Sequence, residues 1–262
     1  MSICMKVWYM NGAGNDFMVI DARGKDYDFE KLALQLCPIT GADGFMAVDY
    51  SDKADFKLHF YNSDGTRGEM CGNGARCICR YAYDNGIAGA SMVVETDAGL
   101  VTGQRLDQDL YRVKLNNPGI LDLNRKGDCT YVELGNPGVP HAVKEVPGLR
   151  YENKAEYFEM ARALRHDPAF PKGANVNLYT WISPEAVRVL TFERGVEDYT
   201  LACGTGCGST AVTLWSQGKL PGGRLIAQNQ GGLLVVTIEG ENGIVSSIML
   251  EGSTEVDKIY EI

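Results

Sequence analysis

Hydrophobic and polar residues alternate along two segments that lie in opposite halves of the chain. Asp55–Phe60 reads DFKLHF, and Val187–Phe192 reads VRVLTF. A period of two residues is typical of a β-strand with one buried face, so both segments are predicted strands. The same reasoning, with turn residues at the ends, predicts further strands at Phe17–Asp21, Met92–Thr96, Tyr111–Leu115, Thr130–Leu134, Leu225–Gln228, Leu233–Ile238 and Ile244–Leu250.

A helical pattern follows each of the two alternating segments. Apolar side chains recur at helical spacing over residues 75–82, and residues 210–215 are apolar and tolerate a helix. Each pattern stops before a glycine, which often ends a helix. One other helix is predicted over residues 153–167, with Asn153 as its N-cap, because the next residue is Pro168.

The pattern Cys-Gly-x-Gly occurs twice, first at Cys71 and again at Cys203. The separation of the two cysteines is close to half the length of the chain. Phe60 and Phe192 stand at the same distance before the cysteine of their half, and each is followed by a polar pair and a turn. The sequence therefore predicts a duplication: strand, turn, cysteine, helix, with both cysteines at helix N-termini.

The resulting fold class is α+β. Two similar halves are expected, each a mainly antiparallel sheet against a helix. The segment Leu115–Leu123, which contains Pro-Gly, is the predicted linker between them.

Composition limits the partners of the chain. It is 45% hydrophobic and 23% charged, as in a globular protein, and carries a net charge of −9. A negative protein lacks the electrostatic attraction that nucleic acid or an anionic membrane surface requires, so neither is expected as a partner. Residues 1–10 do not resemble a signal peptide and no apolar run could span a bilayer, so a cytoplasmic location is expected.

The eight cysteines are expected to be reduced. There is no Cys-x-x-Cys pair and there are only three histidines, so no metal site is expected. Packing in the core is the expectation for Cys4, Cys37, Cys77, Cys79, Cys129 and Cys207.

The repeated cysteines are candidates for chemistry. Free N–H groups and the helix dipole stabilise an anion at a helix N-terminus, either a thiolate or a substrate carboxylate. Gly72, Gly74, Gly204 and Gly206 would let such a ligand approach the backbone closely. Two facing helix ends could clamp one small carboxylate between two thiols.

A helix dipole alone does not activate a thiol. It contributes about 0.3–1 kcal/mol, which lowers a pKa near ~8.5 by less than about one unit. Each cysteine therefore needs a polar partner. Glu193 is the candidate for Cys203; the duplicated position beside Cys71 is Tyr61, a poor base, so His141 is the candidate there.

Two opposed acid/base groups suit inversion at a carbon. One thiolate takes the α-proton from one face, and the other thiol returns a proton to the opposite face. The roles exchange in the reverse direction, so a nearly symmetric, duplicated fold has a physical reason. Backbone donors at both helix ends would stabilise the charge that spreads onto the carboxylate.

Six motifs together identify a family. They are NGAGNDFMVID (Asn11–Asp21), GADGF (Gly41–Phe45), YNSDGTRGEMCGNGARC (Tyr61–Cys77), GVPHAV (Gly138–Val143), GANVN (Gly173–Asn177) and ERGVEDYTLACGTG (Glu193–Gly206). In this order the chain resembles the diaminopimelate epimerases, of the cofactor-independent amino-acid racemase and epimerase superfamily. The resemblance implies two pseudo-symmetric domains, each a sheet or barrel wrapped around a central helix, that close on the substrate.

Domain limits follow from the predicted linker together with the resemblance. The first domain is residues 1–116 plus 253–262, since in the family the last residues return to the first domain, and the second is residues 117–252. The resemblance also implies an activity. The implied reaction is epimerisation of L,L-diaminopimelate to the meso form, for lysine and cell-wall synthesis, without a cofactor. A homodimer is compatible with it.

Roles for site residues also follow from the resemblance. Cys71 and Cys203 would transfer the protons, with His141 as partner of Cys71 and Glu193 as partner of Cys203. The reacting carboxylate would be held by Gly72, Asn73, Gly204 and Thr205, and the distal amino-acid end would be read by Asn15, Asn62, Asn175 and Arg194. Glu193 would also contact the substrate.

One loop departs from the family pattern. Where Gly-Asn-Pro-His is usual, this chain has GNPGVPH, so either Asn136 is displaced by an insertion or Val139 takes its place. The departure concerns substrate identity more than reaction type. The first motif has Asn73 where proline racemases would show histidine.

Two alternatives stay open from the sequence. One is a racemase of another amino acid, such as histidine, with the same mechanism. The other is a non-catalytic thiol protein that senses redox state or binds a metal through Cys71 and Cys203. A pyridoxal phosphate enzyme is disfavoured because no lysine lies in the duplicated motifs.

Overall fold

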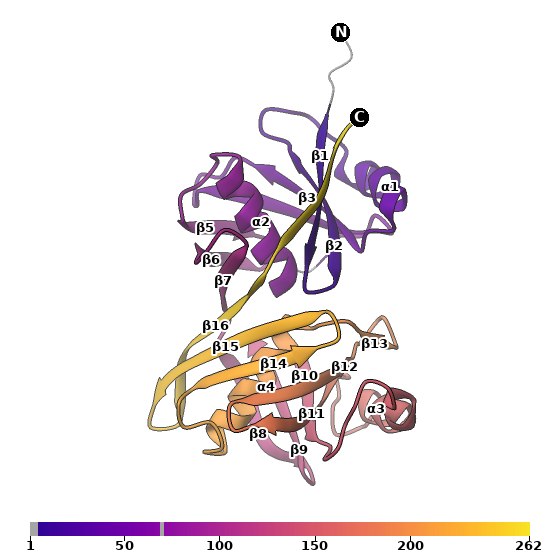
Figure 1. Ribbon diagram of the computed structural model, residues 1–262, viewed down its shortest axis with the longest axis vertical. Helices are drawn as coiled ribbons and strands as arrows, with labels where there is room; N and C mark the ends of the chain where they lie inside the picture. The colour runs from indigo at the N-terminus through magenta and orange to yellow at the C-terminus, as the bar shows by residue number, and fades with distance from the viewer. Residues whose placement is uncertain (1–4, 69–70) are drawn as a thin grey trace. The chain divides into compact units, whose positions relative to one another are not determined.

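The computed structural model describes residues 5–68 and 71–262. The chain forms two compact units, Met1–Val113 with Glu251–Ile262, and Lys114–Leu250. The chain passes between the units within strands β7 and β16 (Figure 1). Each unit contains strands around a helix that begins at one of the repeated cysteines.

The described residues of the first unit form a set of strands and two helices. The strands are β1 (Lys6–Gly12), β2 (Asn15–Asp21), β3 (Gly44–Asp49), β4 (Phe56–Asn62), β5 (Ser91–Thr96), β6 (Gly99–Arg105), β7 (Leu110–Leu115) and β17 (Glu255–Glu261). The helices are α1 (Phe29–Thr40) and α2 (Gly72–Asp84). Helix α2 packs against β1, β2, β3 and β6, whereas α1 packs on β2, β3 and β4 (Figure 1).

The described residues of the second unit repeat this arrangement. The strands are β8 (Pro118–Lys126), β9 (Cys129–Gly135), β10 (Gly138–Glu145), β11 (Asn175–Ser183), β12 (Ala186–Phe192), β13 (Tyr199–Thr200), β14 (Arg224–Asn229), β15 (Gly232–Glu241) and β16 (Ile244–Ser253). The helices are the 3-10 turn η1 (Lys154–Tyr157), α3 (Phe158–Arg165) and α4 (Gly204–Ser216). Helix α4 packs against β9, β10, β11, β14 and β15, and α3 packs on β11 and β12.

Strand pairing shows the duplication directly. In the first unit β1–β2, β3–β4 and β5–β6 are antiparallel, and in the second β9–β10, β11–β12 and β14–β15 are antiparallel. The parallel pairs β2–β3 and β4–β5 correspond to β10–β11 and β12–β14. Parallel strands need a crossover, which α1 and α2 supply in one unit and α3 and α4 in the other. The predicted α+β fold with two pseudo-symmetric, mainly antiparallel halves is confirmed.

The hairpins at the start of each repeat match residue by residue. Gly12 pairs with Asn15 across the β1–β2 turn, and Gly135 pairs with Gly138 across the β9–β10 turn. Strand β2 then runs beside β3, as β10 runs beside β11. The last strand, β17, pairs with β1 and so returns the C-terminal residues to the first unit.

Apolar burial explains why each helix lies where it does. A cluster that includes Val7, Leu36 and Phe45 lies beneath α1, and a second that includes Phe170, Val176 and Phe192 lies beneath α3. The central helices are buried more completely: nearly every residue of α2 up to Ala82 is inaccessible to solvent. Burial of apolar surface at about 25 cal/mol per Å² is the main stabilising term in such layers.

Three local features differ from the sequence prediction. The predicted linker Leu115–Leu123 adjoins the junction of the units at Val113 and Lys114, but its residues 118–123 are the start of β8, which pairs with β9. The helix predicted over 153–167 begins as a 3-10 turn, and its α-helical part starts only at Phe158. The side chain of Asn153 makes no capping bond, because its Oδ1 accepts the Arg150 N–H (3.2 Å) instead.

Helix α1 was not predicted. It contains Pro38, which obscures a helical pattern. Its two ends nevertheless carry typical capping residues. Asp28 accepts the Lys31 N–H at the start, and Gly41 ends the helix in the left-handed conformation (φ 76°).

Candidate functional site

Cys71 is the N-cap of α2. Its backbone is extended (φ −102°, ψ 152°), and its Sγ accepts a hydrogen bond from the Gly74 N–H at 3.2 Å. A Cβ on Gly74 would lie only 3.3 Å from that sulfur, so glycine keeps the turn open. The sulfur therefore lies at the positive end of the helix, among its free N–H groups.

Cys203 is the N-cap of α4 with the same geometry. Its backbone is extended (φ −129°, ψ 110°), and its Sγ accepts the Gly206 N–H at 3.3 Å. A Cβ on Gly206 would lie 2.1 Å from Asn177 Oδ1, so only glycine is accommodated there. The prediction that both repeated cysteines begin helices is confirmed.

Each helix start is tied to the equivalent strand of its own unit. In the first unit, Asn73 Nδ2 donates to Asn15 Oδ1 on β2 at 2.7 Å. In the second, His141 Nε2 on β10 lies 3.0 Å from Thr205 Oγ1. Asn73 and Thr205 occupy the same repeat position, so the two units use different side chains for the same contact.

The tie in the first unit belongs to a longer network. Asn15 Nδ2 donates to Asp43 Oδ2 at 3.0 Å, and Arg76 Nη2 donates to Asn73 Oδ1 at 3.0 Å. Both polar ends of the Asn73 side chain are thus engaged inside the unit. A ligand at this helix end would meet the backbone N–H groups of residues 72–74 rather than the Asn73 carboxamide.

His141 is fully buried within the second unit. The Thr191 hydroxyl donates to Asn177 Oδ1 (3.0 Å), which directs Asn177 Nδ2 to His141 Nδ1 (3.0 Å). This pattern assigns the ring proton to Nε2, which donates to Thr205 Oγ1. Burial lowers the pKa of His141 to about 3, with the Arg194 cation as a second cause. The ring is neutral at pH 7.

The Cys203 thiol lies beside the same hydroxyl. Its Sγ is 3.5 Å from Thr205 Oγ1. Burial raises the pKa of the Cys203 thiol, and the Glu193 carboxylate raises it further, while the Thr205 and Gly206 hydrogen bonds lower it. Glu193 is therefore within electrostatic range of Cys203, and its role as the acid/base partner stays a prediction.

His141 and Cys71 belong to different units. The contact that the structure gives to His141 Nε2 is with Thr205, on the helix of Cys203. Its pairing with Cys71 stays a prediction.

Arg194 is held through its backbone as well as its side chain. Its N–H donates to Asn175 Oδ1 at 2.7 Å, and its Nη1 donates to the Lys172 carbonyl at 3.1 Å. Lys172 is itself fixed, because its Nζ pairs with the buried Glu133 carboxylate at 2.9 Å. Asn175 and Arg194, predicted as distal-site residues, thus lie together.

Asn62 ends β4 and closes the turn that leads to α2. Its N–H donates to the Thr66 carbonyl (2.8 Å), and its Nδ2 donates to the Thr66 hydroxyl (3.0 Å). The structure therefore gives Asn62 a local role in the turn; its contact with a substrate stays a prediction.

The loop GNPGVPH, which departs from the family pattern, contains a hairpin turn. Asn136 lies in the turn between β9 and β10, whereas Val139 lies in β10, opposite Leu134 and shortly before His141. Counted back from the histidine, Val139 stands where the family motif has asparagine. Which of Asn136 and Val139 takes the role of the motif's asparagine stays a prediction.

The remaining described cysteines are buried, as expected for packing. Burial raises the pKa of Cys77 and of Cys79 to about 12, and that of Cys37 and of Cys129 to about 11. Cys207 is also buried, with its Sγ 3.5 Å from Asn229 Oδ1. Cys4 lies outside the described residues.

Sequence reasoning missed four residues that organise the two helix starts. These are Asp43, Arg76, Asn177 and Thr191. Three of them lie in or beside motifs already noted, GADGF, CGNGARC and GANVN, where an acidic, cationic or amide side chain was available as a signal. Thr191 carries no such signal.

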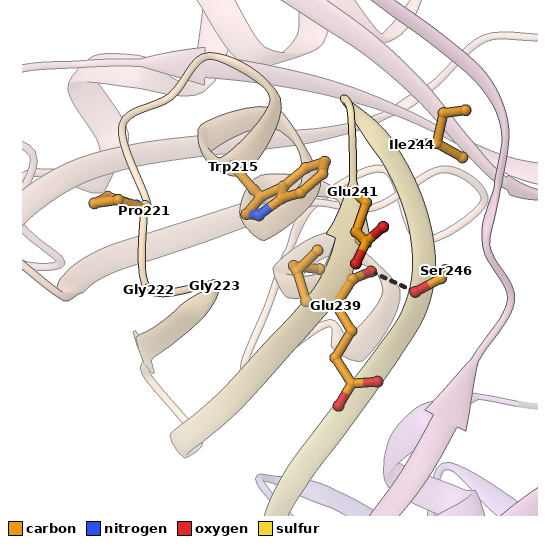
Figure 2. A pocket seen from close by; sticks show the side chains of 10 residues that line it. Trp215, Pro221, Gly222, Gly223, Glu239, Glu241, Ile244 and Ser246 are labelled. Carbon is orange, nitrogen blue, oxygen red and sulfur yellow. Dashed lines mark hydrogen bonds between the residues drawn. The ribbon is translucent and has the colours of Figure 1, made fainter.

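A separate hollow of about 600 Å³ lies in the second unit (Figure 2). Trp215, Glu239 and Glu241 line it, and the Ser246 hydroxyl donates to the Glu239 carbonyl at 3.1 Å. None of the predicted site residues, all of which the structure describes, lines this hollow.

Residues 5–68 and 71–262 contain neither a cluster of metal-ligating side chains nor a membrane-spanning helix. No three or more of their His, Cys, Asp and Glu side chains are grouped so as to hold a metal ion. None of their helices combines the length and apolar character needed to cross a membrane.

Curated relatives match almost the whole chain. Diaminopimelate epimerase of Aquifex aeolicus (strain VF5) is 34% identical over 276 residues, covering 98% of this chain and 96% of the relative. Diaminopimelate epimerase of Flavobacterium psychrophilum is 34% identical over 257 residues, with 96% and 97% covered.

Solved structures share the fold at lower identity. A PhzF-family phenazine biosynthesis protein of Bacillus anthracis has a TM-score of 0.72 at 16% identity, covering 99% of each chain. A hydroxyproline epimerase of Agrobacterium vitis, with bound trans-4-hydroxy-L-proline, has a TM-score of 0.68 at 18% identity, covering 99% of this chain and 91% of the other. At these identities the likeness shows the fold alone.

The family model described as diaminopimelate epimerase matches residues 7–118 and 134–255. These ranges include both cysteine N-caps, the β1–β2 hairpin and strand β10, whereas most of β9 lies outside them. The chain belongs to the diaminopimelate epimerase family.

Proposed function

We propose that the chain epimerises L,L-diaminopimelate to meso-diaminopimelate without a cofactor, using two cysteines. The observation that carries the proposal is the duplicated N-cap: each Cys Sγ accepts an N–H from the second glycine of its motif, at 3.2 Å for Cys71 and 3.3 Å for Cys203. Family membership supports the substrate. A cytoplasmic role in supplying lysine and cell-wall precursors follows from that reaction.

The reaction needs one proton removed and one returned. One cysteine, as thiolate, takes the α-proton, and the C–H electron pair remains on the carbon and spreads into the carboxylate. The other cysteine, as thiol, gives its proton to the opposite face and becomes the thiolate. The N–H groups of Gly72, Asn73, Gly204 and Thr205 stabilise the developing negative charge at both helix ends.

The partner side chains act by hydrogen bonding and charge. We assign His141 as the partner of Cys71, as the family resemblance implies. Because burial holds the pKa of His141 at about 3, it acts as a neutral imidazole and not as a stored cation. Glu193 is assigned to Cys203, whose pKa it raises, which keeps that cysteine protonated as a donor.

The distal end of the substrate carries an amino group and a carboxylate. Arg194 is assigned to the carboxylate, because a guanidinium binds a carboxylate through two parallel hydrogen bonds. The Oδ1 atoms of Asn15 and Asn175 accept from Asn73 and Arg194, and one hydrogen of Asn15 Nδ2 is donated to Asp43, so a ligand would meet the second Nδ2 hydrogen of Asn15 and the Nδ2 group of Asn175. Asn62 completes this set.

The decisive experiment follows hydrogen exchange. The reduced protein, without added cofactor, is incubated with L,L-diaminopimelate in deuterated water, and loss of the α-proton and formation of the meso isomer are followed by NMR. Cys71→Ala and Cys203→Ala should each abolish isomer formation, whereas Cys129→Ala, which removes a buried cysteine of the core, should not. Normal turnover in either of the first two variants would refute the two-thiol mechanism.

Arg194→Ala tests the distal site. It should raise KM at least tenfold, because about 1.4 kcal/mol or more of charged hydrogen bonding is lost. Arg162→Ala, which removes an exposed arginine on α3, is the matched control. Equal KM values in the two variants would remove Arg194 from the distal site.

A second candidate function is favoured by Val139. An apolar side chain in place of the motif's asparagine suits a substrate with a less polar distal end. The same exchange assay with histidine and other amino acids tests this alternative. Exchange with one of them, and none with L,L-diaminopimelate, would make the chain a racemase of that amino acid.

A further inference from the structure

Helix α2 contains a buried cation close to its N-terminus. Arg76 is fully inaccessible to solvent, although arginine is among the residues least often buried. Burying a guanidinium is costly unless its hydrogen bonds are satisfied. A cation in the first half of a helix is also opposed by the helix dipole. The fold therefore keeps Arg76 at a position that is unfavourable for its charge.

The side chain of Arg76 folds back onto the helix start. Its Nη1 donates to the Gly72 carbonyl at 3.2 Å, and its Nη2 donates to Asn73 Oδ1 at 3.0 Å. Gly72 and Asn73 are the two residues that follow Cys71. One guanidinium thus holds both the backbone and the side chain of the turn that presents its N–H groups to the thiol.

The same turn is held from the other side. Asn73 Nδ2 donates to Asn15 on β2 (2.7 Å), and Asn15 donates to Asp43 (3.0 Å). Asp43 also accepts the Asp16 N–H at 3.1 Å. The Asn73 carboxamide is therefore fixed at both ends, and Arg76 supplies the end that lies within the helix.

The second unit serves as an internal control for this arrangement. The residue at the equivalent position of the second repeat, counted from the cysteine, is Gly208. The space for a Cβ there is taken by Leu115 (2.7 Å) and Leu134 (3.1 Å) side chains. Helix α4 nevertheless starts with the same cysteine cap, so this architecture does not require a cation.

We propose that Arg76 is a positioning residue for the proposed epimerisation: it fixes the α2 N-terminal turn so that its N–H groups face Cys71 and the reacting carboxylate. Arg76 acts through Gly72 and Asn73 and does not touch the substrate. The proposal rests on the proposed function for its kinetic consequences only. Its effect on Cys71 is a property of the protein without substrate.

The first readout is the reactivity of the two cysteines. Iodoacetamide alkylation at a fixed pH is followed by mass spectrometry of the peptides that contain Cys71 and Cys203. In Arg76→Gln the Cys71 rate should fall by up to about fivefold, because the turn whose N–H groups stabilise the thiolate loses the two hydrogen bonds from Arg76 that hold it, and a helix end contributes about 0.3–1 kcal/mol. The Cys203 rate should stay within twofold of wild type.

The second readout is kinetic. In Arg76→Gln, kcat should fall at least tenfold and KM should change less than threefold, because the turn matters most when charge develops on the carboxylate. Arg76→Lys keeps the charge but cannot donate to Gly72 and Asn73 with the geometry of the guanidinium, so it should recover only part of the Cys71 alkylation rate. Arg80→Gln is the matched control: Arg80 is one turn further along α2 and bonds to Thr254 and Asp84.

The outcomes separate the alternatives. Equal slowing of both cysteines in Arg76→Gln, or no slowing of Cys71, overturns the proposal. If Arg76→Gln does not fold, Asn73→Ala removes the acceptor instead, and selective slowing of Cys71 there supports the proposal while its absence overturns it. A further outcome is that the wild-type protein exchanges no α-proton of diaminopimelate while Arg76→Gln still slows the alkylation of Cys71 alone. That pair of results would refute the proposed function and leave the role of Arg76 intact.

Discussion

Replacing His141 with glutamine tests the electrostatic state of the second unit. The His141 ring is fully buried, its Nδ1 accepts from Asn177 Nδ2, and its pKa is lowered by burial and by Arg194. Glutamine retains hydrogen-bonding capacity but does not titrate. The variant therefore removes the pH dependence that His141 gives to stability, whatever it does to stability at neutral pH.

The magnitude follows from proton linkage. Burial lowers the pKa of His141 to about 3 in the fold, from an ordinary value of 6.5. Below pH 6.5 the unfolded chain takes up a proton that the folded chain does not, so stability falls as pH falls, until the folded pKa is reached. Each pH unit is about 1.4 kcal/mol, so between pH 7 and pH 5 the loss from this residue is about 2 kcal/mol.

The assay must report the second unit alone. Trp8→Phe leaves Trp181 and Trp215, both in that unit, as the fluorescent probes. Urea unfolding of this background, with and without His141→Gln, is measured from pH 7.5 to pH 5. Over this range the free energy of unfolding should fall less in the His141 variant, by about 2 kcal/mol from the same linkage.

The control replaces a buried hydroxyl of the same unit. Thr213→Val, on α4, changes no titratable group and should leave the pH dependence as in the background. Parallel curves with and without His141→Gln would refute the reasoning, because they would mean that the buried ring takes up a proton in the fold as readily as in the unfolded chain.

Two further predictions concern the helix start at Cys203. Gly206→Ala places a Cβ 2.1 Å from Asn177 Oδ1 and should lower the free energy of unfolding in denaturant by about 1–3 kcal/mol. The control Gly222→Ala, whose Cβ would have no atom within 4 Å, should change it by less than about 0.5 kcal/mol, and equal effects would contradict the close contact. Glu193→Gln removes a charge that, after burial, raises the pKa of the Cys203 thiol, so alkylation of Cys203 at pH 8 should become faster while turnover falls. Slower alkylation would show that the carboxylate does not act on this thiol.

The sequence by itself determined the features that depend on neighbouring residues. The alternation in 55–60 and 187–192 is a property of a strand with one buried face, and both segments are strands. The Cys-Gly-x-Gly repeat places a cap and two small residues at a helix start, and Cys71 and Cys203 both cap helices. The separation of the two cysteines by about half the length of the chain was sufficient to predict two similar halves.

Local signals were insufficient where two of them competed. Asn153 has the side chain of a good N-cap, but its Oδ1 bonds to a backbone N–H on the preceding turn, so the α-helix starts later. Pro118 and the glycine after it indicated a linker, but strand pairing with β9 decided their conformation. A sequence window cannot weigh a local preference against a partner strand.

Only the tertiary structure decided which polar side chains meet. The Asn73 carboxamide bonds to Asn15, 58 residues away, and His141 bonds to Thr205, 64 residues away. These contacts depend on parallel crossovers that bring β2 to α2 and β10 to α4, and side-chain spacing along the chain carries no information about them. The burial that lowers the pKa of His141 likewise comes from the strands and helix packed around it. The sequence identified His141 as a candidate residue but did not predict its burial.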